Sequence, residues 1–188
     1  MIDGIAVEVK RSKRKTISLQ IDRNGNTILR IPSLISDAQA HEILEKRKCW
    51  IEHSLSKIQT SIKETDSLPC YTSEQLSAFA QKAKDIIPER VAQYASIIGV
   101  TYGKITIRCQ KTRWGSCSSC GNLNFNCLLV DMPREVLDSV IVHELCHRRE
   151  MNHSTRFYAE IHRVFPEYDR WDKWLKDNGN RFLRRVSR

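Results

Sequence analysis

Two histidines and a glutamate in the C-terminal part of the chain form the pattern H-E-x-x-H. His143, Glu144 and His147 occupy its three fixed positions. On a helix, residues four apart lie on one face about one turn apart, so both imidazoles can direct a ring nitrogen at one metal ion. Glu144 would lie beside the metal, where its carboxylate can take a proton from a metal-bound water. The pattern therefore predicts a catalytic metal site with Glu144 as the general base.

A third ligand is needed, because a catalytic zinc ion binds three protein side chains and keeps one position open for water. His153 follows His147 by six residues. Asn152 tolerates the left-handed conformation that ends helices, and Ser154 is a good N-cap for a following helix, so the chain can turn back at this point. We therefore predict that His143, His147 and His153 bind one Zn2+ ion per chain.

The residues around the motif bear on this prediction. Apolar side chains recur before it at the spacing of an amphipathic helix, which predicts a helix over about 134–150 that carries the motif into a core. They are Val136, Leu137, Val140, Ile141 and Leu145. The alternative is that the histidines are ordinary core or solvated residues. His162 competes as third ligand, but it falls within an expected helix and suits a packing or surface role.

The composition is that of an ordinary globular protein. The 188 residues include 31 Lys and Arg against 22 Asp and Glu, a formal charge of +9. No apolar run approaches the roughly 18 residues that span a membrane, and no signal-peptide pattern is present, so we expect a cytoplasmic protein without a membrane partner. The basic excess is concentrated at residues 10–15 and 181–188, where a solvated face is the commoner explanation and nucleic-acid binding the alternative.

Seven cysteines are spread along the chain. An odd number without a secretory signal fits reduced thiols better than a disulfide framework. Cys117 and Cys120 form a C-x-x-C pair, which can bind zinc or act in redox chemistry. A structural zinc site usually needs a second pair at matching spacing, and the sequence has none, so this role is the lesser interpretation.

Residues 1–66 predict an N-terminal appendage. An alternating run over 17–21, a turn signal and a second extended run over 27–31 predict a β-hairpin. A long helix from residue 36 or 37 to about residue 63 is expected next. The segment 64–72 has no periodicity and contains a proline, which is typical of a linker.

Residues 73–188 predict an α+β hydrolase domain. A helix over about 73–98 precedes two strands, 104–109 and 123–129, and the motif helix follows them. We expect the strands to form a small antiparallel sheet that packs against both helices. If the strand 123–129 lies at the sheet edge near the metal, an extended peptide could pair with it. Two further helices, the last ending near Asn178, complete the chain.

Several short motifs together resemble one known family. They are Arg113-Trp114-Gly115-Ser116-Cys117-Ser118, Leu123-Asn124-Phe125-Asn126, Pro133, H-E-x-x-H, and Asn152-His153-Ser154 with Phe157. This combination resembles the YgjP-like metallopeptidase family, part of a gluzincin-like group that includes the SprT-like proteases. The resemblance covers most of the chain. It implies a zincin-like fold, His143, His147 and His153 as metal ligands, and Glu144 as the catalytic base.

The leading hypothesis is therefore a zinc-dependent peptidase that acts on a peptide or protein. Zinc would polarise the scissile carbonyl, while Glu144 would accept the proton of the attacking water and pass it to the leaving amine. A further donor is needed for the developing oxyanion. Arg113, Asn126 and Tyr158 are the tentative substrate-binding residues that could supply it.

Two alternatives keep the metal site. One is hydrolysis of a nucleotide phosphoanhydride, because zinc can also activate water against phosphorus. The lack of a Gly-rich phosphate loop and of a carboxylate cluster for magnesium argues against it. The other is an SprT-like protease that acts on nucleic-acid-bound partners, although no recognised nucleic-acid motif is present. A scaffold without activity ranks last, since it needs no base beside three histidines.

Overall fold

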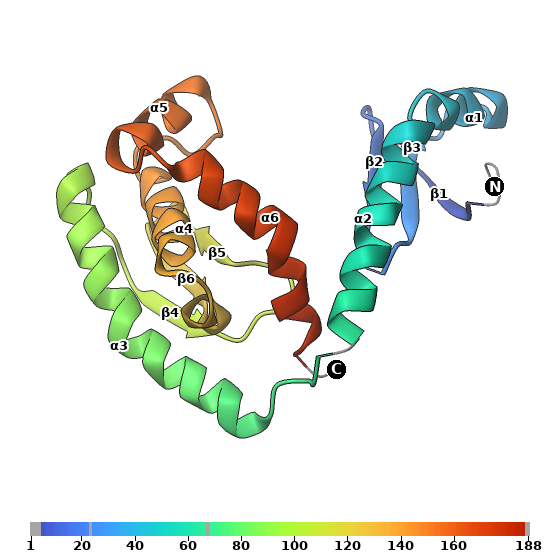
Figure 1. Ribbon diagram of the computed structural model, residues 1–188. Helices are drawn as coiled ribbons and strands as arrows, with labels where there is room; N and C mark the ends of the chain where they lie inside the picture. The colour runs from blue at the N-terminus through green and yellow to red at the C-terminus, as the bar shows by residue number, and fades with distance from the viewer. Residues whose placement is uncertain (1–4, 23, 67, 187–188) are drawn as a thin grey trace. The chain divides into compact units, whose positions relative to one another are not determined.

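The computed structural model describes residues 5–22, 24–66 and 68–186. The chain divides into two compact units, Met1–Ser67 and Leu68–Arg188. Each unit has a hydrophobic core and a three-stranded sheet of its own, and Figure 1 labels their helices and strands. None of the helices in the described ranges combines the length and the apolar character that crossing a membrane requires.

The first unit contains the predicted β-hairpin. Strands β2 (Ser18–Ile21) and β3 (Thr27–Pro32) pair antiparallel. In the turn between them, the carboxylate of Asp22 accepts hydrogen bonds from two backbone N–H groups at 2.8 and 2.9 Å. The hairpin prediction is therefore confirmed. A further strand, β1 (Val7–Ser12), pairs parallel with β3, so that β3 is the central strand of this sheet.

The prediction of one long helix after the hairpin is wrong. The structure has two helices, α1 (Asp37–Glu45) and α2 (Lys48–Asp66). The backbone N–H of Lys46 closes α1 by donating to the carbonyl of Glu42 at 3.0 Å. The break lets apolar residues of both helices pack on the central strand. The resulting core consists of Leu29, Ile31, Ala40, Leu44 and Ile51.

The second unit begins with helix α3 (Ser73–Ile98), which confirms the helix predicted over 73–98. Thr72 caps it reciprocally with Gln75. The Thr72 hydroxyl accepts the backbone N–H of Gln75 at 3.2 Å, and the Gln75 side chain accepts the backbone N–H of Thr72 at 3.0 Å. Two otherwise unpaired donors at the helix start are thereby satisfied. Pro88 lies inside the helix without ending it.

The sheet of the second unit is mixed. The antiparallel pairing that was predicted for the strands at 104–109 and 123–129 is therefore wrong. Strands β4 (Ile105–Arg108), β5 (Gly115–Cys117) and β6 (Leu123–Asn126) lie in the order β4-β6-β5. β6 pairs antiparallel with β5 and parallel with β4, because the chain reverses its direction twice between β4 and β6, once before β5 and once after it. β6 is thus the central strand, and β4 and β5 form the edges. The condition for peptide pairing with strand 123–129, a position at the sheet edge, is therefore not met.

β6 also ends earlier than predicted. The side-chain oxygen of Asn126 accepts the backbone N–H of Leu128 at 3.1 Å, and the chain continues as the short 3-10 helix η1 (Cys127–Asp131). The amide nitrogen of Asn126 donates to the carbonyls of Gln110 and Arg113 at 2.7 and 3.0 Å. This one buried side chain therefore joins the end of β6 to the loop that precedes β5.

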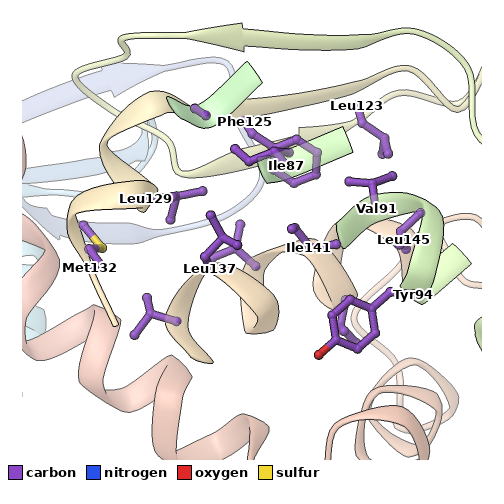
Figure 2. Packing of buried hydrophobic residues seen from close by; sticks show 14 of the residues in the cluster. Ile87, Val91, Tyr94, Leu123, Phe125, Leu129, Met132, Leu137, Ile141 and Leu145 are labelled. Carbon is purple, nitrogen blue, oxygen red and sulfur yellow. The ribbon is translucent and has the colours of Figure 1, made fainter. Parts of the chain in front are cut away.

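Helix α4 (Arg134–Cys146) contacts α3, α5 (Thr155–Val164), α6 (Tyr168–Arg184) and β5. It ends before the predicted boundary at 150, because the following residues form a turn. Figure 2 shows its apolar face packed against α3 and β6. The residues of this packing include Leu137, Ile141 and Leu145 of α4, Ile87, Val91 and Tyr94 of α3, and Leu123 and Phe125 of β6. The fold class is α+β, as predicted.

Helix α6 continues past its predicted end near Asn178 and reaches Arg184. Gly179, which favours a helix end by sequence, is instead buried within the helix. A Cβ at this position would lie 3.1 Å from two atoms of the Trp114 indole. The absence of a side chain therefore allows α6 to pack closely on Trp114, the residue that precedes β5.

Candidate metal centre

His143 and His147 stand at the C-terminal end of α4. His143 lies in the last helical turn, and His147 is the C-cap residue. Their rings meet edge to face with centroids 4.9 Å apart. The close approach agrees with the expectation for residues one turn apart on one helix face.

His153 reaches the same place from the connection between α4 and α5. The connection ends at Ser154, whose side chain accepts a backbone N–H of α5 at 3.3 Å, as expected for an N-cap. The Nε2 atom of His153 lies 3.1 Å from the Nε2 atom of His143. Each of His143, His147 and His153 offers one ring nitrogen, and these atoms all lie within 4.8 Å of one another.

The orientation of the rings is set by neighbouring groups. The Nδ1 atom of His143 lies 2.8 Å from the hydroxyl of Tyr168, and that of His147 lies 3.1 Å from the carbonyl of Glu150. Because a carbonyl only accepts hydrogen bonds, this contact places a proton on Nδ1 of His147 and a lone pair on its Nε2. The buried ring of Phe157 contacts all three imidazoles, with centroid distances of 4.6–5.0 Å.

Burial favours the neutral form of the imidazoles. It lowers the pKa of His143 to about 4, and the neighbouring His147 and His153 lower this pKa further. The pKa of His147 is also lowered, chiefly by burial. Neutral imidazole is the form in which histidine binds a metal ion.

The donor set fits a divalent metal ion. The Nε2 atoms of His143 and His153, which face each other at 3.1 Å, can share at most one hydrogen bond, so a shared cation satisfies both nitrogens better. Nitrogens about 2.0–2.1 Å from a tetrahedral zinc ion stand roughly 3.3 Å apart, close to the distance of this pair. Within the described part of the chain, this is the one group of three or more His, Cys, Asp or Glu side chains gathered closely enough to hold a metal.

Glu144 is buried against β5, with 7% of its surface exposed. Burial raises the pKa of its carboxyl group to about 7, against the opposing effects of the Arg113 guanidinium and of a hydrogen bond from the backbone of Cys117. Gly115 makes this position available, because a Cβ there would lie 2.6 Å from Oε1 of Glu144. The arrangement leaves a carboxyl group that can gain and lose a proton near neutral pH.

A cavity of about 280 Å³ opens beside His143 and Glu144. Its walls come from α4, from α6 and from the segment 112–115. The carboxyl group and an imidazole therefore both face a space that a substrate can enter.

The three residues predicted to bind substrate have different surroundings. Arg113 is exposed and lines the cavity together with Glu144. Tyr158 on α5 is 39% exposed, and its ring centroid lies 6.3 Å from that of His153. Asn126 is buried, and both ends of its side chain bind backbone groups. We infer that Asn126 positions the loop that carries Arg113 and that it does not contact the substrate.

Two residues at the site were not assigned a role from the sequence. Tyr168 lies 25 residues from His143 in the sequence, although its hydroxyl is adjacent to the ring of His143. Gly115 lies in a strand too short for a periodic signal. His162, the competing ligand, is outside the histidine group, and its Nε2 atom lies 3.2 Å from a carboxylate oxygen of Asp169.

Comparisons with known proteins bear on the same region. Residues 72–178, more than half of the chain, match the family described as YgjP-like, metallopeptidase domain. Among solved structures, the chain is similar to the metallopeptidase zymogen of Pyrococcus abyssi abylysin, with 22% identity over 48% of this chain and 93% of that chain and a TM-score of 0.44. The metallopeptidase zymogen of Methanocaldococcus jannaschii jannalysin shows 24% identity with the same coverage and TM-score. No curated protein matches the sequence.

Proposed function

The chain belongs to the YgjP-like metallopeptidase family, and from this premise we propose that it is a zinc-dependent peptidase with Glu144 as its general base. The observation that carries the proposal is the convergence of His143, His147 and His153 within 4.8 Å beside the buried carboxyl group. Three imidazoles with one position left open are a ligand set of catalytic zinc sites. Peptides or proteins are the substrates that a peptidase family implies.

The histidines would hold the zinc ion. Tyr168 and Glu150 turn the Nδ1 atoms of His143 and His147 away from the ligand group, which leaves each Nε2 atom to bind metal. When bound, zinc polarises the scissile carbonyl and lowers the pKa of a water molecule toward about 7.

Glu144 would move the proton. Its carboxylate accepts a proton from the attacking water and delivers it to the nitrogen of the leaving amine, so one carboxyl group serves first as base and then as acid. The backbone N–H of Cys117 holds this carboxyl group against β5. Arg113 lines the cavity, and Tyr158 lies on α5 near His153. We propose that these two side chains donate hydrogen bonds to the carbonyl oxygen of the substrate.

The edge of the catalytic sheet offers a place for the peptide backbone. In the order β4-β6-β5, the outer side of β5 has no strand neighbour among the described residues. β5 also packs against α4 at Glu144. We propose that an extended peptide pairs with β5, because this would lead its backbone past the catalytic carboxyl group.

Two measurements on the purified protein test this function. Metal analysis should find one zinc ion per chain. The zinc-loaded protein should cleave an unstructured protein, and Glu144→Gln should lower the rate by at least about 10²-fold because the proton acceptor is gone. The variant should keep its zinc, since all three histidines are intact.

Two results would contradict the proposed peptidase function. Release of phosphate from nucleoside triphosphates without peptide cleavage, if it disappears in Glu144→Gln, would assign the site to nucleotide hydrolysis. A folded preparation that has met no chelator and binds no zinc would remove the basis of both activities.

A further inference from the structure

The sheet of the first unit has two faces of different character. The hydrophobic core of this unit lies between α1, α2 and one face of the sheet, where Leu29 and Ile31 of the central strand β3 are fully buried (Figure 1). Neighbouring residues of a strand point to opposite faces. Arg30 lies between Leu29 and Ile31, so its side chain points away from this core. We call the face that carries Arg30 the outer face.

Three cationic side chains lie in one row across the outer face. Lys10 of β1 pairs with Arg30, and Arg30 pairs with Ser18 of β2. Side chains of directly paired residues project from the same face. The hydroxyl of Ser18 accepts a hydrogen bond from the guanidinium group of Arg14 at 3.2 Å, which places Arg14 at the β2 end of the row. Because neighbouring strands lie about 4.8 Å apart, the row is about 10 Å long.

The positive charge of this row is only weakly neutralised. Among the described residues, the guanidinium groups of Arg14 and Arg30 bind neutral side-chain oxygens of Ser, Thr and Gln and no carboxylate. Lys10 forms an ion pair with Glu8 at 3.2 Å, but both side chains are at least half exposed, at 50% and 59%, and exposed pairs contribute little. Residues 5–36 contain seven Lys and Arg against two Asp and Glu. The outer face therefore has a positive potential that attracts a polyanion.

We propose that the outer face binds the phosphate backbone of a nucleic-acid duplex through Lys10, Arg14 and Arg30. Each strand of a DNA duplex carries one phosphate charge per about 3.4 Å of helix axis, so a row of about 10 Å can contact about three phosphates. Residues 5–36 contain no Phe, Tyr or Trp, so the sheet lacks the aromatic side chains on which the bases of a single strand stack. Phosphate contacts carry no base information, so this binding is independent of sequence. It does not depend on the peptidase function proposed for the second unit.

The test is fluorescence anisotropy of a labelled DNA duplex of about 20 base pairs, titrated with the full chain between about 50 and 200 mM salt. Three phosphate contacts should lower the affinity about 40-fold over this range, because the logarithm of the binding constant falls by about 0.9 per contact for each tenfold rise in salt. The triple variant Lys10→Gln, Arg14→Gln and Arg30→Gln should lose most of this salt dependence. At about 50 mM salt it should bind at least about 10-fold more weakly than the wild type. A duplex of different sequence should bind the wild type equally well.

Two further variants separate the row from net charge and from stability. Lys46→Gln, Arg47→Gln and Lys57→Gln together remove three cations from exposed positions in the α1–α2 segment of the same unit, and this matched control should bind the duplex like the wild type. Glu8 shares the outer face with Lys10, because the two are separated by one residue of β1. Glu8→Gln should therefore tighten duplex binding by about 2- to 5-fold, the worth of an exposed ion pair. A poorly folded protein would not bind more tightly.

Four results would overturn the proposal. Absence of duplex binding by the wild type at about 50 mM salt would remove it outright. Equal losses in the two triple variants would mean that the overall charge, and not the row, attracts the duplex. Tighter binding of the wild type to single-stranded DNA of the same length, or to vesicles of phosphatidylserine and phosphatidylcholine, would assign the outer face to another partner. Unchanged affinity in Glu8→Gln would show that the outer face does not contact the duplex.

Discussion

Replacement of Gly115 by alanine tests whether β5 positions the catalytic carboxyl group. A Cβ at this position would lie 2.6 Å from Oε1, 2.8 Å from Cγ and 3.0 Å from Cδ of Glu144. Ordinary van der Waals contact begins at 3.4 Å, and Oε1 would lie at 2.6 Å. Oε1 therefore has to move by about 0.8 Å. The cavity is the open side of Glu144. We therefore expect the carboxyl group to move into the cavity and away from the backbone N–H of Cys117.

The expected effect on catalysis follows from this displacement. Misplacement of a catalytic group by about 1 Å can cost about 10²-fold in rate. The whole contribution of a general base, about 10²- to 10⁴-fold, sets the upper limit. We expect kcat to fall about 10²-fold with little change in KM, because the methyl group disturbs proton transfer more than substrate binding. Strain of about 1–3 kcal/mol should be partly offset by the roughly 0.5–1 kcal/mol gained on replacing a strand glycine.

The assay combines steady-state peptide cleavage, zinc content and thermal unfolding. Gly103→Ala is the matched control, because its Cβ would lie 2.5 Å from Oδ1 of Asn122, a clash of similar size with a different side chain. It should lower stability while the activity of the folded protein stays near the wild-type value. If Gly115→Ala and Gly103→Ala showed the same kcat, or if Gly115→Ala lost its zinc, the positioning role of Gly115 would be refuted.

Three other predictions concern the same site. His153→Ala should lower zinc affinity and activity together, whereas His162→Ala should leave zinc content nearly intact after dialysis; the reverse pattern would show that the ligand assignment is wrong. Tyr168→Phe keeps the ring but removes the hydroxyl beside Nδ1 of His143, so zinc affinity measured against a competing chelator should fall by about 10- to 100-fold. The same change at exposed Tyr158 should have little effect on zinc affinity, and equal losses in both variants would contradict the orienting role of Tyr168. In the metal-free protein, burial raises the pKa of Glu144 from 4.5 to about 7, so the wild type loses stability as the pH rises from 4.5 through 7. Glu144→Gln should therefore be more stable than the wild type by up to about 3 kcal/mol at pH 8 and by almost nothing near pH 4.5; urea titrations at both pH values measure this difference, and a gain that is independent of pH would refute the cause.

The fold was predictable where the information lies close together in the sequence. Helix α3 combines a long apolar period with a capping pair only three residues apart, Thr72 and Gln75. The direction of the β4–β6 pairing has no such local signal. Alternation identifies a strand but not its neighbour, and the direction here depends on β5, which is only three residues long. The continuation of α6 past Gly179 likewise depends on a distant residue, Trp114.

The same distinction applies to the site. Helix geometry relates residues four apart, so His143, Glu144 and His147 could be assigned to one face before any tertiary contact was known. Tyr168 could not be assigned, because it contacts His143 only once α6 packs on α4. A local pattern can thus identify the groups that bind and react, but a group that orients them from another element becomes visible only with the fold.

The short segment 113–117 shows what the fold adds. Arg113 lines the cavity, Trp114 packs on α6, Gly115 makes room for Glu144, and the backbone of Cys117 binds its carboxyl group. Each of these contacts joins β5 or one of the two residues before it to an element that lies later in the chain. Helical or strand periodicity cannot predict the roles of these residues, because neighbouring side chains contact different elements of the fold. A segment of this kind is constrained residue by residue by its tertiary contacts, so Gly115→Ala should impair proton transfer while zinc affinity is kept, the opposite of the effect expected for Tyr168→Phe on α6.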